Sequence, residues 1–163
     1  MHIIGGLVNT IDDSWKKLDV PRSALMNESA SLERSRIMRF VKSKSTKPEL
    51  IVRQILTKLG YRYRLHRAEL PGKPDITFIG RKKAIFVHGC FWHGHDCKRG
   101  ARVPKANRGY WVAQITRNRQ RDKDNLHRLS EQGWRYICVF ECEMKDAEAL
   151  SARLTDFLID NEA

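Results

Sequence analysis

The sequence lacks a long hydrophobic run. No apolar stretch in its 163 residues approaches the roughly 20 residues that a helix needs to cross a bilayer. It also lacks a secretory signal, because Met1 to Val8 is too short and has no basic start. Internal repeats and low-complexity segments are absent, so no repeat architecture is indicated. These absences predict a cytoplasmic protein, and the length suits one domain with its own hydrophobic core.

Acidic residues are few relative to basic ones. The chain has 31 Lys and Arg against 19 Asp and Glu, a formal charge of +12 and a pI near 9.9. This balance predicts a polyanionic partner, although a basic protein without a specific partner is the simpler alternative.

The chain divides into a short arm and a folded part. Paired glycines, paired aspartates and Pro21 interrupt residues 1–30, which we expect to form a flexible arm that orders on a partner. Residues 31–163 form the expected domain. It opens with a basic segment from Ser31 to Lys47, predicted as a short helix whose basic face either contacts phosphates or is simply solvated.

Periodicity then predicts an α/β fold with a mixed central sheet flanked by helices. The first helix is expected at Pro48–Leu59, with Thr46 as N-cap and Glu49 completing a capping box. The remaining elements are strands at Tyr61–His66, Asp75–Ile79, Ala84–His88 and Trp134–Phe140, and helices at Tyr110–Gln132 and Asp146–Ile159. The apolar run Ala84–His88 indicates a central strand, buried on both faces.

Cysteine and histidine gather in the loop after that strand. The pattern Cys90-x4-His95-x-Cys97, with Cys142 at the end of the last strand, provides the four ligands of a structural Cys3His zinc site. Cys138 would lie about 13 Å from Cys142 along a strand, so only one of them is a ligand, and we choose Cys142. Alternatives are buried free thiols, two disulfides in a secreted protein, or a catalytic zinc, which four protein ligands disfavour.

Acidic and imidazole side chains lie near the same strand end. Asp75 follows the rigid turn Gly72-Lys73-Pro74, and its carboxylate could bind Mg2+ together with the Val87 carbonyl. His88 and His93 could move protons there. Alternatively, Asp75 is an ordinary turn residue, Glu49 caps a helix and Asp122 is a solvated helix residue.

Two aromatic residues, Phe91 and Trp92, lie inside the Cys/His loop, and Trp111 begins the next helix. They either fill the core beneath the loop or wedge between base pairs of a nucleic acid. Their place in a loop that a metal would hold rigid favours the wedge.

At these residues the sequence resembles the very-short-patch mismatch repair endonucleases, the Vsr family. The resemblance extends from Arg34 to the end of the last helix. It is carried by RSRIMR (34–39), LPGKPD (70–75), IFVHGCFWHGHDC (85–97), W-x6-N-x3-D (111–122) and GWRYICVFEC (133–142).

The resemblance implies a restriction-endonuclease-like PD-(D/E)XK core, and it implies a role for each matching residue of the site. It implies Asp75 and the Val87 carbonyl as catalytic magnesium contacts, and the cysteines and histidine above as structural zinc ligands. His93 is implied as the catalytic histidine, supported by Glu49, His88 and Asp122. The implied DNA contacts are Phe91, Trp92, Trp111, Lys73 and Asn118.

The sequence also departs from the family's pattern. Val87 stands where family members have Thr, Gly94 and Asp96 interrupt the usual run of histidines, and the linker from Cys97 to Trp111 differs. The N-terminal segment is also longer than usual.

The main expectation is a Mg2+-dependent monomer in the cytoplasm, associated with the nucleoid, that nicks double-stranded DNA 5′ to the T of a T:G mismatch. Such mismatches arise from deaminated 5-methylcytosine, and the family cooperates with the MutL mismatch repair factor. Alternatives are a restriction- or homing-type endonuclease that cuts matched DNA and a non-catalytic zinc-stapled DNA-binding module.

Overall fold

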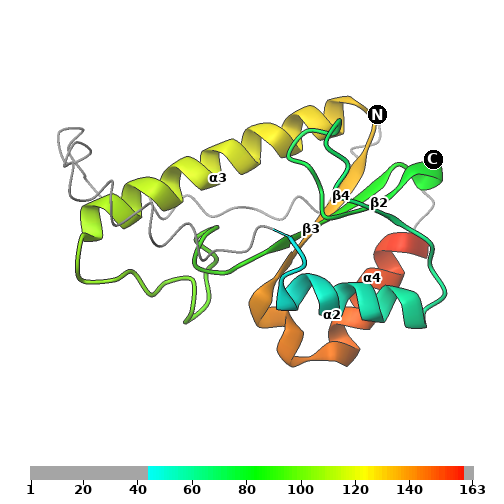
Figure 1. Ribbon diagram of the computed structural model, residues 1–163, viewed down its shortest axis with the longest axis horizontal. Helices are drawn as coiled ribbons and strands as arrows, with labels where there is room; N and C mark the ends of the chain where they lie inside the picture. The colour runs from blue at the N-terminus through cyan, green and yellow to red at the C-terminus, as the bar shows by residue number, and fades with distance from the viewer. Residues whose placement is uncertain (1–43, 160–163) are drawn as a thin grey trace, which may run out of the picture.

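The computed structural model describes residues 44–159 (Figure 1). The expected N-terminal arm and the basic segment up to Ser43 lie outside the described residues, so the predicted boundary near residue 30 stays a prediction. Among the residues described, no helix combines the length and the apolar character needed to cross a membrane.

Four strands form one mixed sheet, as the periodicity predicts. They are β1 (Arg64–Leu65), β2 (Ile76–Phe78), β3 (Lys83–His88) and β4 (Arg135–Phe140), in the order β1-β2-β3-β4. The first three pair antiparallel, whereas β3 and β4 are parallel, with His88 opposite Phe140. The parallel pair requires a crossover, and the long helix between the two strands makes it.

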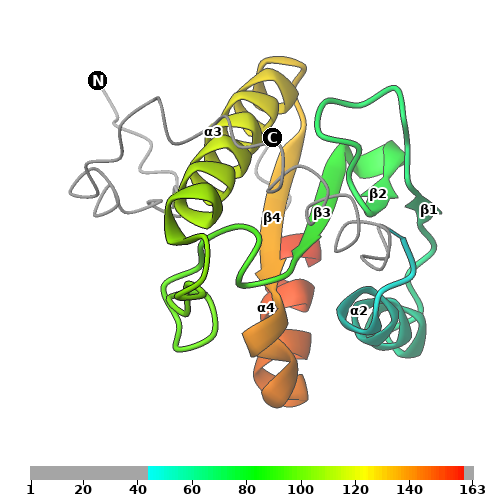
Figure 2. The same ribbon diagram turned by 60° about the vertical axis from the view of Figure 1, so that its left-hand side comes forward.

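The helices cover both faces of the sheet. α3 (Arg108–Glu131) runs along one face, and α2 (Lys47–Lys58) and α4 (Ala147–Ile159) lie together against the other (Figures 1 and 2). Two short 3-10 turns, η3 (Ile79–Arg81) and η4 (Glu141–Lys145), follow β2 and β4. The described part of the chain is therefore a three-layer α/β structure.

The strand β3 is central and buried, which confirms the prediction from its apolar run. Its side chains alternate between the two layers: Ile85 and Val87 join the core with α2 and α4, whereas Ala84 and Phe86 pack with α3. By the same alternation His88, the last residue of β3, lies on the α3 side. The end of β3 is thus the point where both layers meet the following loop.

The expected strand Tyr61–His66 shortens to the two residues of β1. Tyr61 and Tyr63 alternate with basic residues because their rings pack edge-on against Phe78, with centroids 6.1 Å and 6.4 Å away. The alternation therefore reflects side-chain packing on Phe78, and Tyr61 and Tyr63 are not part of the paired strand. The other predicted elements within the described residues agree with the structure to within one or two residues at their ends, including Asp75–Ile79, which loses one residue at each end to become β2.

The start of α2 differs from a standard capping box in one contact. Thr46 is the N-cap, and its hydroxyl oxygen accepts a hydrogen bond from the Glu49 amide at 3.4 Å. Glu49, however, accepts from the Ser45 amide at 2.7 Å instead of reaching the Thr46 amide. Only one oxygen of this carboxylate is used in capping.

Candidate active site

Three groups of ionisable side chains gather around the end of β3. Within each group, the candidate ligand atoms lie within 4.8 Å of one another. We call them the Cys/His cluster (Cys90, His95, Cys97, Cys142), the His/Asp cluster (His88, His93, Asp122) and the acid cluster (Glu49, His66, Asp75).

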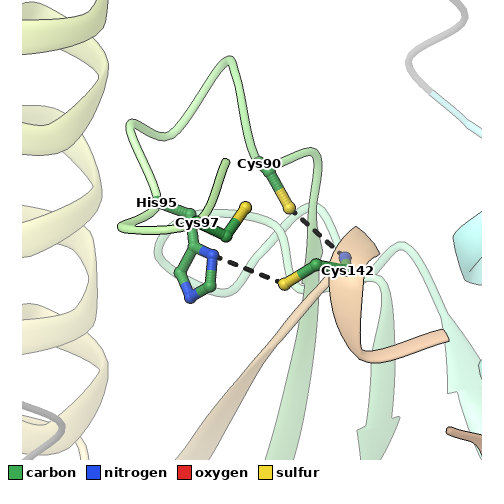
Figure 3. A group of neighbouring side chains, drawn as sticks. All are labelled: Cys90, His95, Cys97 and Cys142. Carbon is green, nitrogen blue, oxygen red and sulfur yellow. Dashed lines mark hydrogen bonds between the residues drawn. The ribbon is translucent and has the colours of Figure 1, made fainter. Parts of the chain in front are cut away.

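The Cys/His cluster depends on the parallel pairing of β3 and β4. The two strands end side by side, so Cys90 in the loop after β3 meets Cys142 in η4, although 52 residues separate them. The Cys142 amide donates to the Cys90 sulfur at 3.3 Å, and the Cys142 sulfur lies 3.5 Å from His95 Nδ1 (Figure 3). All four side chains converge on one point (Figure 3).

The loop itself brings His95 and Cys97 into this group. The His95 amide donates to the Cys90 carbonyl at 2.9 Å, and the Gly100 amide donates to the Cys97 sulfur at 3.4 Å. Gly100 packs so closely that an added Cβ would lie 1.9 Å from the His95 carbonyl oxygen. A side chain at position 100 would therefore force the loop apart.

The donor set of the Cys/His cluster fits zinc. Tetrahedral thiolate ligands of zinc lie roughly 3.8 Å apart, comparable with the spacing in this cluster. Burial raises the pKa of the Cys90 thiol to about 12. Against the effect of burial, hydrogen bonds with His95 and with the Gly100 and Arg99 amides lower the pKa of Cys97 to about 6. A zinc ion binds thiolates and would offset the cost of ionising the buried thiol.

The fourth cysteine of the chain, Cys138, lies outside this group. It is half-buried in β4 and packs against the cluster of Ala84, Phe86 and the α3 leucines. Burial raises the pKa of its thiol to about 12. This placement agrees with the choice of Cys142 as the candidate ligand.

The acid cluster forms because β2 and β3 are antiparallel. The start of β2 therefore lies beside the end of β3, and Asp75 Oδ2 accepts a hydrogen bond from the Val87 amide at 2.7 Å. Glu49 approaches from α2 and is only 1% exposed. Its Oε1 accepts no hydrogen bond, although His66 Nε2 lies 3.2 Å away and Arg53 Nη1 3.6 Å away.

These carboxylates fit a hard divalent cation. Burial raises the pKa of Asp75, and the neighbouring Glu49 charge adds to this effect, while the Val87 amide opposes it. A cation would relieve both the burial cost and the repulsion, and would satisfy the buried Glu49 oxygen. Val87 takes part here through its amide, whereas a role for its carbonyl stays a prediction.

One member of the acid cluster, His66, was missed by sequence reasoning, which placed it as the last residue of an edge strand. It lies nine residues before Asp75, on the other side of the Leu70–Pro74 turn. The only available signal was an imidazole directly after the residues that became β1.

The His/Asp cluster has two stacked imidazoles. The rings of His88 and His93 are 3.7 Å apart and inclined by 1°, and His93 Nδ1 lies 2.5 Å from Asp122 Oδ2 on α3. Burial, followed by the charge of His93, lowers the pKa of His88 to about 3. Against the effect of burial, the hydrogen bond and charge of His93 lower the pKa of Asp122. Asp122 is thus an anion that orients His93 through Nδ1, and it is not a freely solvated helix residue.

The three aromatic residues expected to wedge into DNA lie together and are half-buried. The ring centroids of Phe91, Trp92 and Trp111 are 5.1 Å, 5.6 Å and 6.0 Å apart in edge-on contacts. Asn118 is 8% exposed and donates from Nδ2 to the Trp92 carbonyl at 2.9 Å. Lys73 is exposed in the turn before Asp75.

Comparison with known proteins shows related enzymes. The family model "DNA mismatch endonuclease Vsr" matches residues 26–99. The type II nicking enzyme V.XorIIP of Xanthomonas oryzae pv. oryzae is 48% identical over 134 residues, covering 82% of this chain and 98% of that protein. The type II nicking enzyme V.NmeAIP of Neisseria meningitidis is 43% identical over 122 residues, covering 75% and 86%. The DNA mismatch endonuclease Vsr of Escherichia coli is 36% identical over 130 residues, covering 77% and 83%.

These matches, on a basic chain with carboxylate and imidazole clusters at one sheet edge, define the class of the protein as a DNA endonuclease. Within that class the chain belongs to the Vsr family, which confirms the resemblance read from its motifs.

Proposed function

We propose that the protein is a divalent-metal-dependent endonuclease that nicks one strand of double-stranded DNA, built on a PD-(D/E)XK-like core. The observation that carries this proposal is the buried acid cluster at the end of β3, where one Glu49 oxygen accepts no hydrogen bond beside Asp75. Nuclease cores of this type bind their cation with carboxylates at a sheet edge, in reach of the phosphate backbone.

Each side chain would then have a defined task. Glu49 and Asp75 hold the cation, with the Val87 carbonyl as a further contact; the Val87 amide fixes Asp75 Oδ2 and leaves Oδ1 for binding. Bound Mg2+ supplies activation of water and neutralises charge on the phosphate. His93, oriented through Nδ1 by Asp122, presents Nε2 for proton transfer. His88 stacks on His93 and fixes the plane of its ring.

The Cys/His cluster would hold a structural zinc ion. Four protein ligands leave no open position for water, so the ion stiffens the loop and does not take part in the reaction. We name residues 89–95 the wedge loop. Phe91 and Trp92 on this loop, with Trp111 beside them, would insert between base pairs, while Lys73 and the basic surface contact phosphates.

Two observations bear on the substrate, and each favours a different candidate. V.XorIIP and V.NmeAIP, both named type II nicking enzymes, share more identity with this chain than E. coli Vsr does. This favours a restriction-type endonuclease with a Vsr-like catalytic domain acting on matched DNA.

The second candidate is nicking 5′ to the T of a T:G mismatch, with MutL as a cooperating factor. The aromatic group beside the His/Asp cluster supports it, because rigid aromatics unstack a mispaired step at lower cost than a paired one. In either case we expect a monomer that acts on nucleoid DNA in the cytoplasm.

A nicking assay tests the proposal. Matched and T:G duplexes, of one sequence and of varied sequence context, are incubated with Mg2+ and with wild type, Asp75→Ala or Asp156→Ala. Asp156→Ala is the control, because Asp156 is an exposed acid on α4. Asp75→Ala is expected to bind DNA but not to cut it. Equal cutting of both duplexes supports the restriction-type candidate, and cutting of T:G alone supports the mismatch candidate. Undiminished nicking by Asp75→Ala would refute the enzymatic site.

A further inference from the structure

We propose that His66 is a third protein ligand of the cation bound by Glu49 and Asp75, which makes this a mixed nitrogen–oxygen site. This inference rests on the proposed function and identifies a residue that neither the motifs nor the family resemblance assigned.

The geometry of the acid cluster supports a ligand role. His66 Nε2 lies 3.2 Å from Glu49 Oε1, and Nδ1 lies 4.0 Å from Asp75 Oδ1. Glu49 Oε1 nevertheless accepts no hydrogen bond, so its contact with His66 is close but lacks the geometry of a hydrogen bond. One ring nitrogen of His66 and one oxygen of each carboxylate lie within 4.8 Å of one another, a spacing that suits ligands of one ion.

The backbone fixes His66 in this position. His66 has φ 48°, in the left-handed region that a residue with a side chain adopts at a cost of order 1 kcal/mol or more. Its amide donates to the Asp75 carbonyl at 3.1 Å, which ties the two ligand candidates together beyond the end of β1. The imidazole is held at 20% exposure, between the surface and the buried Glu49. Strained backbone of this kind concentrates at functional sites.

A nitrogen ligand changes which ions the site prefers. Carboxylate oxygens suit Mg2+, whereas imidazole adds affinity for Mn2+ and more so for Co2+ and Ni2+. The acid cluster would therefore accept Mg2+ but bind Mn2+ more tightly, and this preference would depend on His66. Arg53 Nη1, 3.6 Å from Glu49 Oε1, is the competing charge that an ion would displace from this oxygen.

Binding of Mn2+ to the full, zinc-loaded chain tests the inference. Affinity is measured by calorimetry and by electron paramagnetic resonance, and electron spin echo modulation detects nitrogen bound to Mn2+. His66→Gln removes the ligand, and His127→Gln, an exposed histidine on α3 at 73% exposure, is the matched control. We expect nitrogen modulation in wild type and His127→Gln and its loss in His66→Gln. We also expect Mn2+ binding in His66→Gln to weaken about tenfold or more, with a smaller change for Mg2+.

The outcomes separate this inference from the proposed function. Wild type that binds Mn2+ and nicks DNA, but lacks nitrogen modulation or keeps it in His66→Gln, overturns the role of His66 and leaves the endonuclease intact. If wild type neither binds divalent ions nor nicks DNA, both the role of His66 and the proposed endonuclease function are overturned. His66→Asn is a second variant should His66→Gln fold poorly, with zinc content and circular dichroism as folding checks. Should neither variant fold, nitrogen modulation in wild type supports a nitrogen ligand at the ion, and its absence overturns the inference.

Discussion

Asn118 has two competing roles that one substitution can separate. The family resemblance implies a DNA contact, but in the structure Nδ2 donates to the Trp92 carbonyl at 2.9 Å, and Oδ1 accepts from Gln114 Nε2 at 3.3 Å. The side chain is 8% exposed, so Asn118→Ala leaves the Trp92 carbonyl without its donor in a largely dry place. An unmade buried hydrogen bond costs about 1–3 kcal/mol. We expect the free energy of unfolding to fall by about that amount.

The assay combines urea unfolding with hydrogen exchange of the wedge loop. The amide of His93 bonds to the Gly89 carbonyl at 3.3 Å, and it should exchange faster in Asn118→Ala because the loop is no longer tied to α3. Gln114→Ala is the control; it removes the longer, half-buried bond to Asn118 and an exposed bond from Arg117, and should cost less than about 1 kcal/mol. Unchanged stability and exchange, together with weakened DNA binding, would refute the positioning role and return Asn118 to the DNA interface.

Three further predictions concern the other clusters. Cys142→Ser should lose most of its zinc by elemental analysis while Cys138→Ser keeps it, and full zinc content in Cys142→Ser would exclude that ligand. Asp122→Asn should lower the free energy of unfolding by about 1.5–3 kcal/mol at neutral pH by weakening the contact with His93. The folded-state pKa of Asp122 is lowered below 3.8, so this difference in stability from wild type should persist as the pH falls to about 4. It should vanish once the pH passes below the folded-state pKa. A stability difference that disappears near pH 6 would contradict the assignment. Gly94→Ala should destabilise the protein by about 1–3 kcal/mol in thermal unfolding, because Gly94 has φ 58° and an added Cβ would lie 2.7 Å from a methyl group of α3; stability equal to wild type would show that the loop yields.

The sequence predicted those features that depend on local pattern. The apolar run before His88 predicted a central strand, and helical spacing predicted all three described helices nearly to the residue. The spacing of Cys90, His95 and Cys97, with Cys142 at a strand end, predicted the Cys/His cluster, and the family motif implied the same four residues. Local periodicity is informative here because each element buries one face or both against the same core.

Features that depend on tertiary contacts could not be read in advance. His66 joins the acid cluster because its backbone turns left-handed and pairs with Asp75, and neither property has a residue-level signature in a non-glycine residue. Asn118 is a polar residue on a helix whose other polar residues are mostly exposed, yet it faces the wedge loop. Glu49 was expected either to cap a helix or to serve the site; its Oε2 accepts a hydrogen bond at the helix start, and its Oε1 is buried without one.

The parallel pairing of β3 and β4 also sets the order in which the protein can mature. Cys90 and Cys142 become neighbours only when β4 docks beside β3, after the chain has been synthesised through η4. An ion that needs all four donors therefore binds late and reports that the crossover through α3 is complete. With the roles proposed above, the wedge loop would stay without its brace until that moment. A partly folded chain would then lack both the zinc ion and the rigid contact surface for DNA, and zinc content would report the fraction of chains that have completed the fold.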